Sequence, residues 1–188
     1  AVDIYRQSLA HAEHLREADP EDGLAYELVL DQRKSLATAL RRSGNLEQAQ
    51  EQTRLLILAA EDFVDRDPLN RLRQRRLFAI HFDEARVQYD EALQRLRDPA
   101  TQAEGMALLR KSVESFDRCS NFYRGILDQD PMGSYDKFNL DAAEVELQHA
   151  KAIETLGNES EDAALIRTAM DSYQRAADLY VLHSKESE

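Results

Sequence analysis

Two pairs of side chains in this sequence have the spacing of metal ligands on a helix. His11 and His14 are three residues apart, and so are Glu146 and His149. Residues at i and i+3 lie on one helical face, where imidazole and carboxylate groups can share a metal ion. A di-iron bundle needs two Glu-x-x-His motifs and two further glutamates, and the sequence has one such motif. A metal-binding helical bundle is therefore an alternative to an ordinary polar or acidic helix face.

Cys119 is the only cysteine and the only candidate thiol nucleophile. A catalytic thiol needs an electropositive, accessible environment, whereas a small buried cysteine is inert. The sequence has no Gly-rich phosphate loop, no Gly-x-Ser-x-Gly elbow and no His-Glu-x-x-His motif that would complete a catalytic arrangement. We expect Cys119 to be a packed residue and the protein to have no enzymatic activity and no cofactor.

A dense basic cluster lies at the start of a long charged segment. Its members are Arg71, Arg73, Arg75 and Arg76. Such a cluster could dock a phosphorylated or acidic partner segment, because arginine pairs well with carboxylate and phosphate groups. The alternative is a solvated face of a helix.

The overall charge limits the partners of the chain. Its 188 residues carry a formal net charge of −12, and a phosphate backbone or anionic lipid surface binds mainly through lysine and arginine. The longest apolar run, at 55–60, is far shorter than the ~18 residues of a membrane span. We expect a cytoplasmic protein that binds neither nucleic acid nor membrane. The absence of an initiator methionine suggests a fragment of a longer protein.

The prolines divide the chain into helices. All four follow aspartate, at positions 20, 68, 99 and 131. Proline disfavours a helical conformation in the preceding residue, and Asp and Pro favour a helix start. Gly44 is predicted to cap one helix, and Asn45 with Gln48 to begin the next; Thr101 and Glu104 form a capping-box pattern. The predicted helices are 1–18, 21–42, 46–66, 69–97, 102–129, 134–156 and 160–184.

Small residues recur at a constant distance from these Asp-Pro pairs, which we call the Asp-Pro corners. Ala1, Ala49 and Ser112 each lie 19 residues before a proline. Aromatic or apolar residues follow four and seven positions later in most copies, and Ala169 begins a fourth copy with Tyr173 and Ala176. Ala37, Ala85 and Gln148 are related in the same way to the alternate helices. The pattern predicts a helix-pair repeat, which buries a continuous core only when its units stack.

This pattern resembles the tetratricopeptide-repeat superfamily. The closest unit is "SLATALRRSGNLEQAQ" at 35–50, which has the family's small and leucine positions followed by Gly-Asn. The helices are longer than in the usual unit of ~34 residues, as in repeat arrays beside the catalytic domain of some bacterial serine/threonine kinases. The resemblance implies one all-α domain over 1–188, a right-handed superhelical array of antiparallel helix pairs that acts as a protein-interaction scaffold. A regulatory or oligomerising tail of a signalling kinase is the alternative.

The resemblance also implies a concave groove lined by the first helix of each unit. Offsets of −3, +1 and +4 from the crossing positions lie on one helical face. They select Lys34, Thr38, Arg41, Phe82, Arg86, Tyr89, Val145, His149 and Ala152. This mildly basic and aromatic strip suits an acidic or phosphorylated peptide with an apolar anchor. The alternative is that these residues only pack or face water.

Residues 1–18 match the second helix of a unit whose first helix is absent. An uncovered second helix exposes its apolar face, so we expect Tyr5 and Leu9 to lie on the surface. Such a surface could support self-association through the N-terminal helix.

Overall fold

The computed structural model describes the backbone of residues 2–129 and 136–186, and the side chains of residues 2–125 and 140–182. Within those residues the chain is all-α, as the sequence predicts, and has no strand. The seven helices are α1 (Val2–Ala18), α2 (Gly23–Arg42), α3 (Leu46–Asp65), α4 (Arg71–Leu96), α5 (Gln102–Gln129), α6 (Asp136–Ser160) and α7 (Ala163–Glu186). No helix in the described ranges has the length and apolar character needed to cross a membrane.

The Asp-Pro corners are turns, but their aspartates do not cap the helices that follow. Asp22 caps α2, where its carboxylate accepts a hydrogen bond from the amide of Leu24 at 2.9 Å. Asn70 has the same role for α4 and accepts from the amides of Leu72 and Arg73. Helices α2 and α4 therefore begin after the corner, because the first good capping geometry occurs there. The corner at 130–131 lies outside the described residues.

Two of the predicted caps are wrong in their hydrogen bonds. Asn45 makes no side-chain cap to α3; its amide donates instead to Ser43 Oγ at 3.0 Å. The Thr101 hydroxyl donates to the Arg95 carbonyl at 2.9 Å, so it satisfies the end of α4 and not the start of α5. Gly44 does take the left-handed conformation expected after a helix end, with φ of 79°.

Helix α6 is longer than predicted. The Gly-Asn pair at 157–158 does not end it, and the helix continues to Ser160. A Cβ at Gly157 would lie 2.8 Å from Ile166 Cδ1 and 3.1 Å from Leu165 Cβ on α7. This glycine therefore permits close approach of α6 and α7, and the left-handed turn falls at Glu161, with φ of 54°.

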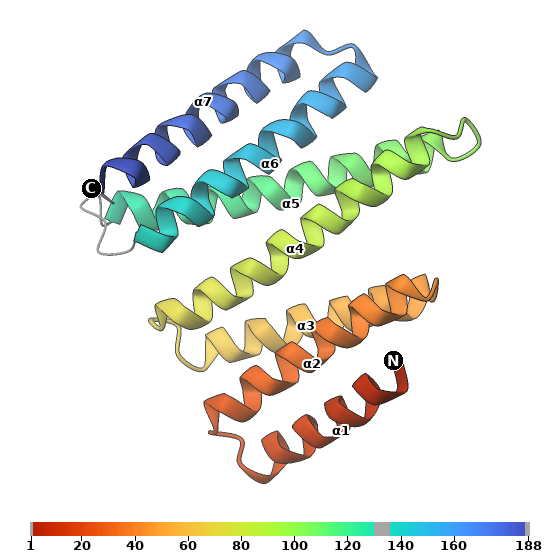
Figure 1. Ribbon diagram of the computed structural model, residues 1–188, viewed down its shortest axis with the longest axis vertical. Helices are drawn as coiled ribbons and strands as arrows, with labels where there is room; N and C mark the ends of the chain where they lie inside the picture. Colours follow the sequence, from red (N-terminus) through yellow and green to blue (C-terminus); the bar gives the residue numbers. More distant parts are fainter. Residues whose placement is uncertain (1, 130–135, 187–188) are drawn as a thin grey trace. The chain divides into compact units, whose positions relative to one another are not determined.

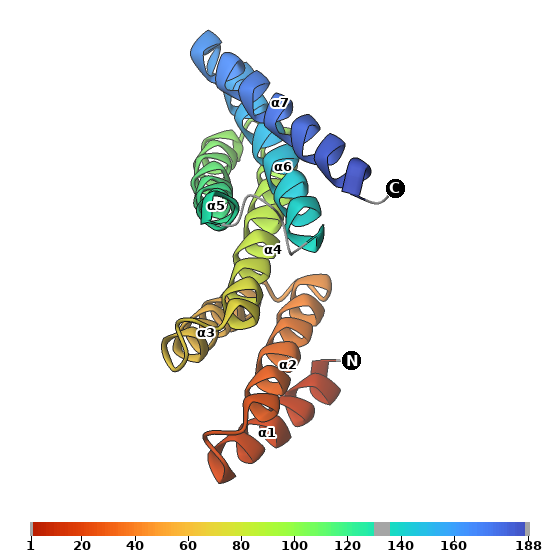
Figure 2. The same cartoon turned by 90° about the vertical axis from the view of Figure 1, so that its left-hand side faces the viewer.

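The chain divides into two compact units, Ala1–Ile80 and His81–Glu188, and the division falls within α4. In the first unit α1 packs against α2, and α2 against α3; in the second, α5 packs against α6, and α6 against α7. Figures 1 and 2 show α1 beside α2, and α7 beside α6.

The first unit has two apolar clusters. One contains Leu9 and Ala12 of α1 with Val29, Leu36 and Leu40 of α2. Leu9 is 7% exposed and Tyr5 is partly buried against this cluster. The prediction that Leu9 lies on the surface is therefore wrong, because α2 covers that face of α1.

The second cluster of this unit is built around a stacked aromatic pair. The rings of Tyr26 on α2 and Phe63 on α3 are nearly parallel, with centroids 5.0 Å apart. The Arg66 guanidinium lies 4.8 Å from the Tyr26 ring centroid, and that of Arg73 lies 4.1 Å from the Phe63 centroid. Ile80 of α4 belongs to the same cluster. The arginines thus cover the rings while they keep contact with solvent.

The second unit buries the small residues that the repeat pattern selected. Ala85, Ser112 and Cys119 are 0% exposed, and Ala169 and Ala176 are almost fully buried. Ala37 and Ala49 in the first unit are also buried. Small side chains at these positions allow helices to approach closely, which is the packing role that their spacing predicts.

Candidate functional site

A pocket of about 790 Å³ opens between α1 and α2 in the first unit. Two residues that line it, Lys34 and Thr38, were selected by the repeat spacing as groove residues. The full lining consists of Val2, Asp3, Tyr5, Asp31, Lys34, Ser35, Thr38, Ala39, Arg42 and Ser43. The pocket therefore combines an apolar part with hydroxyl groups and charges of both signs, and ligand pockets likewise combine apolar lining with a few polar groups.

The two acidic residues of this pocket are already paired. Asp3 accepts a hydrogen bond from Arg6 Nη1 at 3.1 Å, and Asp31 forms an ion pair with Arg76 of α4. The Thr38 hydroxyl donates to the Lys34 carbonyl at 2.9 Å, so it is held against its own helix. An entering acidic group would meet Lys34 and Arg42 beside carboxylates whose charge is already compensated.

The remaining predicted groove residues have different surroundings. Arg41 is partly buried near the end of α2 but does not line the pocket. In the second unit, Phe82 packs edge to face on Phe116, with ring centroids 5.7 Å apart, and Arg86 lies 5.9 Å from the Phe82 centroid. Phe82 is part of an apolar cluster, so the exposed Arg86 is its solvent-facing neighbour.

Tyr89 and the three α6 positions are mainly packing residues. The Tyr89 hydroxyl shares a hydrogen bond with Thr155 Oγ1 at 3.0 Å. Val145, His149 and Ala152 are 2%, 4% and 0% exposed. A partner could touch His149 only if neighbouring helices moved.

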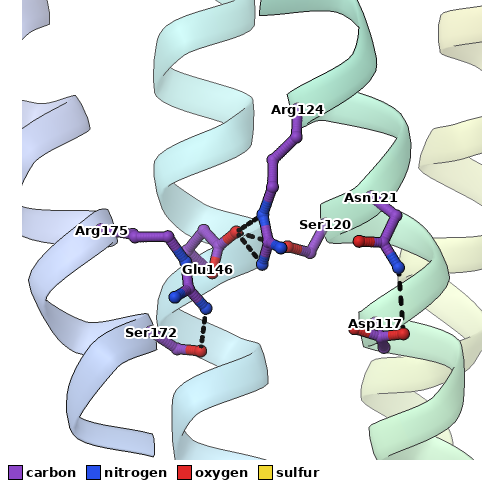
Figure 3. A network of polar contacts seen from close by, with 7 residues as sticks. All are labelled: Asp117, Ser120, Asn121, Arg124, Glu146, Ser172 and Arg175. Atoms are coloured by element: carbon purple, nitrogen blue, oxygen red, sulfur yellow. Dashed lines mark hydrogen bonds and ion pairs between the residues drawn. The ribbon is translucent and has the colours of Figure 1, made fainter. Parts of the chain in front are cut away.

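His149 instead lies beside a buried carboxylate. Glu146, one turn earlier on α6, has a side chain that is 4% exposed. Its Oε1 accepts hydrogen bonds from Ser120 Oγ and from both Nε and Nη2 of Arg124, the latter at 3.1 and 3.0 Å. Its Oε2 accepts from Arg175 Nε at 3.1 Å. Figure 3 shows Arg124 and Arg175 reaching Glu146 from the helices on either side.

These contacts set the charge state of the Glu146 carboxyl. Burial alone would raise its pKa, but the Ser120 hydroxyl and the Arg124 and Arg175 guanidiniums hold the pKa below its ordinary value. The carboxylate is ionised and engaged at both oxygens. In this arrangement Glu146 is a counter-ion for arginine, and the Glu-x-x-His spacing does not produce a metal ligand pair.

Burial shifts the pKa of His149 in the opposite direction. Desolvation lowers its pKa, although the nearby Glu146 and Asp117 carboxylates act against that shift. Its Nδ1 is buried and has no hydrogen-bond partner among the described residues. The imidazole is therefore neutral in the folded protein at neutral pH.

The other candidates for metal or thiol chemistry are separate from each other. His11 and His14 are exposed on α1. Among the described residues, no group of three or more His, Cys, Asp or Glu side chains could hold a metal ion. Burial raises the pKa of the Cys119 thiol to about 12, so the thiol stays protonated. This agrees with the interpretation of Cys119 as a packed residue.

The basic cluster at the start of α4 takes part in local packing. Besides stacking on Phe63, Arg73 donates to the Phe63 carbonyl at 3.0 Å, and Arg76 pairs with Asp31. Arg71 and Arg75 also have interaction partners. These contacts tie the start of α4 to α2 and α3.

Sequence reasoning did not identify Arg124 and Arg175. A signal was present, because Glu146 lies among the apolar residues Ala142, Val145 and Ile153 on one face of α6. A charged residue in such a position needs a partner. The sequence did not show which arginines pair with Glu146, because several arginines on the other helices have a spacing that could place them on a facing surface.

Comparisons with known proteins return no match: no family model, curated protein or solved structure is similar to this chain.

Proposed function

We propose that this chain is a protein-interaction module that binds a segment of a partner in the pocket between α1 and α2. The observation that supports the proposal is the presence of Lys34 and Thr38 in that pocket, since the repeat spacing selected both residues independently. The partner is an acidic or phosphorylated peptide with an apolar anchor, which Lys34 and Arg42 would attract and Tyr5 and Val2 would contact.

The proposal includes the tetratricopeptide-like organisation. Helices α2 and α3, α4 and α5, and α6 and α7 would be three successive pairs in a right-handed superhelical array, with α1 as the second helix of a preceding pair. Burial of Ala37, Ala49, Ala85, Ser112 and Ala169 supports it, because these are the positions at which the helices of such units cross.

Selection of peptides from a displayed random library on the whole chain tests the site. The affinity of the selected peptides should fall at least about tenfold in Thr38→Glu, or about 1.4 kcal/mol, because the added carboxylate repels an acidic ligand from the pocket. Gln50→Glu, an equal change of charge on the exposed face of α3, is the matched control and should leave affinity within about twofold, or ~0.4 kcal/mol.

Two results would contradict the proposal. One is the absence of any enriched peptide; the other is equal binding of the selected peptides to Thr38→Glu and to the unmodified chain. Far-ultraviolet circular dichroism of each variant verifies that the helices are intact. This control is needed because Leu36 and Leu40, two residues to either side of Thr38, belong to the buried apolar cluster of the unit.

A further inference from the structure

Arg124 on α5 and Arg175 on α7 converge on one carboxylate from two helices (Figure 3). The two guanidiniums bind different oxygens of Glu146. Glu146 therefore holds both guanidiniums beside a single carboxylate.

The pair has more hydrogen-bonding capacity than Glu146 uses. A guanidinium has five N–H donors. Arg124 uses its Nε and Nη2 groups for Glu146; Arg175 uses Nε for Glu146 and Nη2 for Ser172. Three donors on each arginine therefore have no partner among the described side chains, including both hydrogens of each Nη1.

The two arginine side chains are partly exposed, whereas the carboxylate is not. The side chains of Arg124 and Arg175 are 40% and 38% exposed, compared with 4% for Glu146. Neutralising one buried carboxylate requires one arginine, so two arginines leave a surplus positive charge that faces solvent. The Asp117 carboxylate accepts from Asn121 Nδ2 at 3.0 Å, and Figure 3 shows both apart from the arginine pair.

We propose that Arg124 and Arg175 form a binding site for an oxyanion, a phosphate or carboxylate group, on the surface between α5 and α7. Glu146 binds both guanidiniums and Ser172 binds that of Arg175, so an anion finds them already oriented and binding costs little side-chain entropy. Fork-shaped guanidiniums suit the planar or tetrahedral arrangement of oxygens in such groups. The site is independent of the pocket between α1 and α2, and either could exist without the other.

Nuclear magnetic resonance titration of the whole chain tests the site, with the arginine Nε–Hε signals as the readout. Inorganic phosphate and acetate are added separately while sodium chloride keeps the ionic strength constant. We expect saturable shifts of the Arg124 and Arg175 signals. Saturation by phosphate alone assigns a phosphoryl ligand, and saturation by both probes assigns a general oxyanion site.

The variants distinguish this site from general attraction of anions. Arg175→Gln should weaken phosphate binding at Arg124 at least about tenfold, and Arg175→Lys should weaken it less, because lysine keeps the charge but loses the fork. Arg167→Gln removes a charge from an exposed position on the same helix and should change nothing. If Arg175→Gln unfolds the second unit, Arg175→Lys still tests the site.

The proposal is overturned if neither probe produces a saturable shift, or if the Arg167 signal responds as strongly as that of Arg175. It is also overturned if Arg175→Lys binds phosphate as well as the unmodified chain. The two arginines would then serve only to hold α5 and α7 to α6.

Discussion

The two units differ in what they bury. Among the described side chains, the buried residues of the first unit are apolar, and they include a single hydroxyl-bearing ring, Tyr26. Within the same described part of the chain, the second unit buries seven polar or charged residues. They are Gln88, Ser112, Ser115, Ser120, Glu146, His149 and Ser172. Apolar packing is non-directional, whereas a buried polar network is stable only in one geometry.

The first unit keeps most of its charges at the edges of the core, although it also pairs Arg33, whose side chain is 13% exposed, with Glu13. Arg66 and Arg73 lie over Tyr26 and Phe63, where their guanidiniums stay partly hydrated. The second unit places a carboxylate inside and brings cations to it. We infer that the first unit depends mainly on buried apolar area, and that the second depends in addition on specific pairing between α5, α6 and α7.

The largest expected effect is on the apolar core of the first unit. Leu30 is 0% exposed in the cluster around Tyr26 and Phe63, so Leu30→Ala should lower the free energy of unfolding by about 2 to 5 kcal/mol. Leu24→Ala, on the same helix at 77% exposure, should change it by less than about 0.5 kcal/mol. Urea unfolding followed by circular dichroism measures both. Equal effects would show that this core does not depend on the Leu30 cluster.

The next effect concerns the polar network of the second unit. Glu146→Gln removes the charge that two arginines share and should cost about 2 to 3 kcal/mol, less than for a fully buried pair, because the arginines keep some contact with water. Glu144→Gln is the control on the same helix, since Glu144 accepts only from Gln148 and Tyr180 among the described side chains. It should cost less than about 1 kcal/mol. Similar values for the two variants would refute the proposed dependence on pairing.

A smaller effect tests how closely the helices of the second unit approach. A Cβ at Gly105 would lie 2.9 Å from the backbone nitrogen of Leu96, so Gly105→Ala should destabilise by about 1 to 2 kcal/mol. A Cβ at Gly125, on the same helix, would have no described atom of another element within 4 Å. Gly125→Ala should stabilise by about 0.5 to 1 kcal/mol, because alanine restricts the unfolded chain. Thermal unfolding would contradict the close approach if both variants gained stability.

The smallest expected effect is the contribution of His149 to the loss of stability in acid. It is absent at neutral pH and appears on acidification. Burial lowers the pKa of His149 below its ordinary value of 6.5, so the unfolded chain binds the proton first and stability falls as pH drops through that value. Urea unfolding at pH 7 and pH 5 should show a smaller loss for His149→Gln than for the unmodified chain. His14→Gln, at an exposed position, should behave like the unmodified chain. An unchanged loss in His149→Gln would exclude His149 as a source of the acid sensitivity.

Local sequence signals predicted the helices because they act over a few residues. The Asp-Pro corners and Gly44 interrupt helices whatever surrounds them, and the seven observed helices start and end near the predicted positions. The hydrogen bonds of the helix caps were harder to predict. Asn45 and Thr101 each had several hydrogen-bond partners within reach, and the final choice depended on the preceding helix end.

The sequence by itself determined which positions are small, apolar or charged, and hence an all-α chain with packed residues such as Cys119 and Ala85. Only the tertiary structure decided which helix covers each face. Leu9 is buried because α2 lies over it, and Glu146 is a buried ion because Arg124 and Arg175 reach it from two other helices. Helix periodicity specifies a face, but the partner on that face comes from residues distant in sequence.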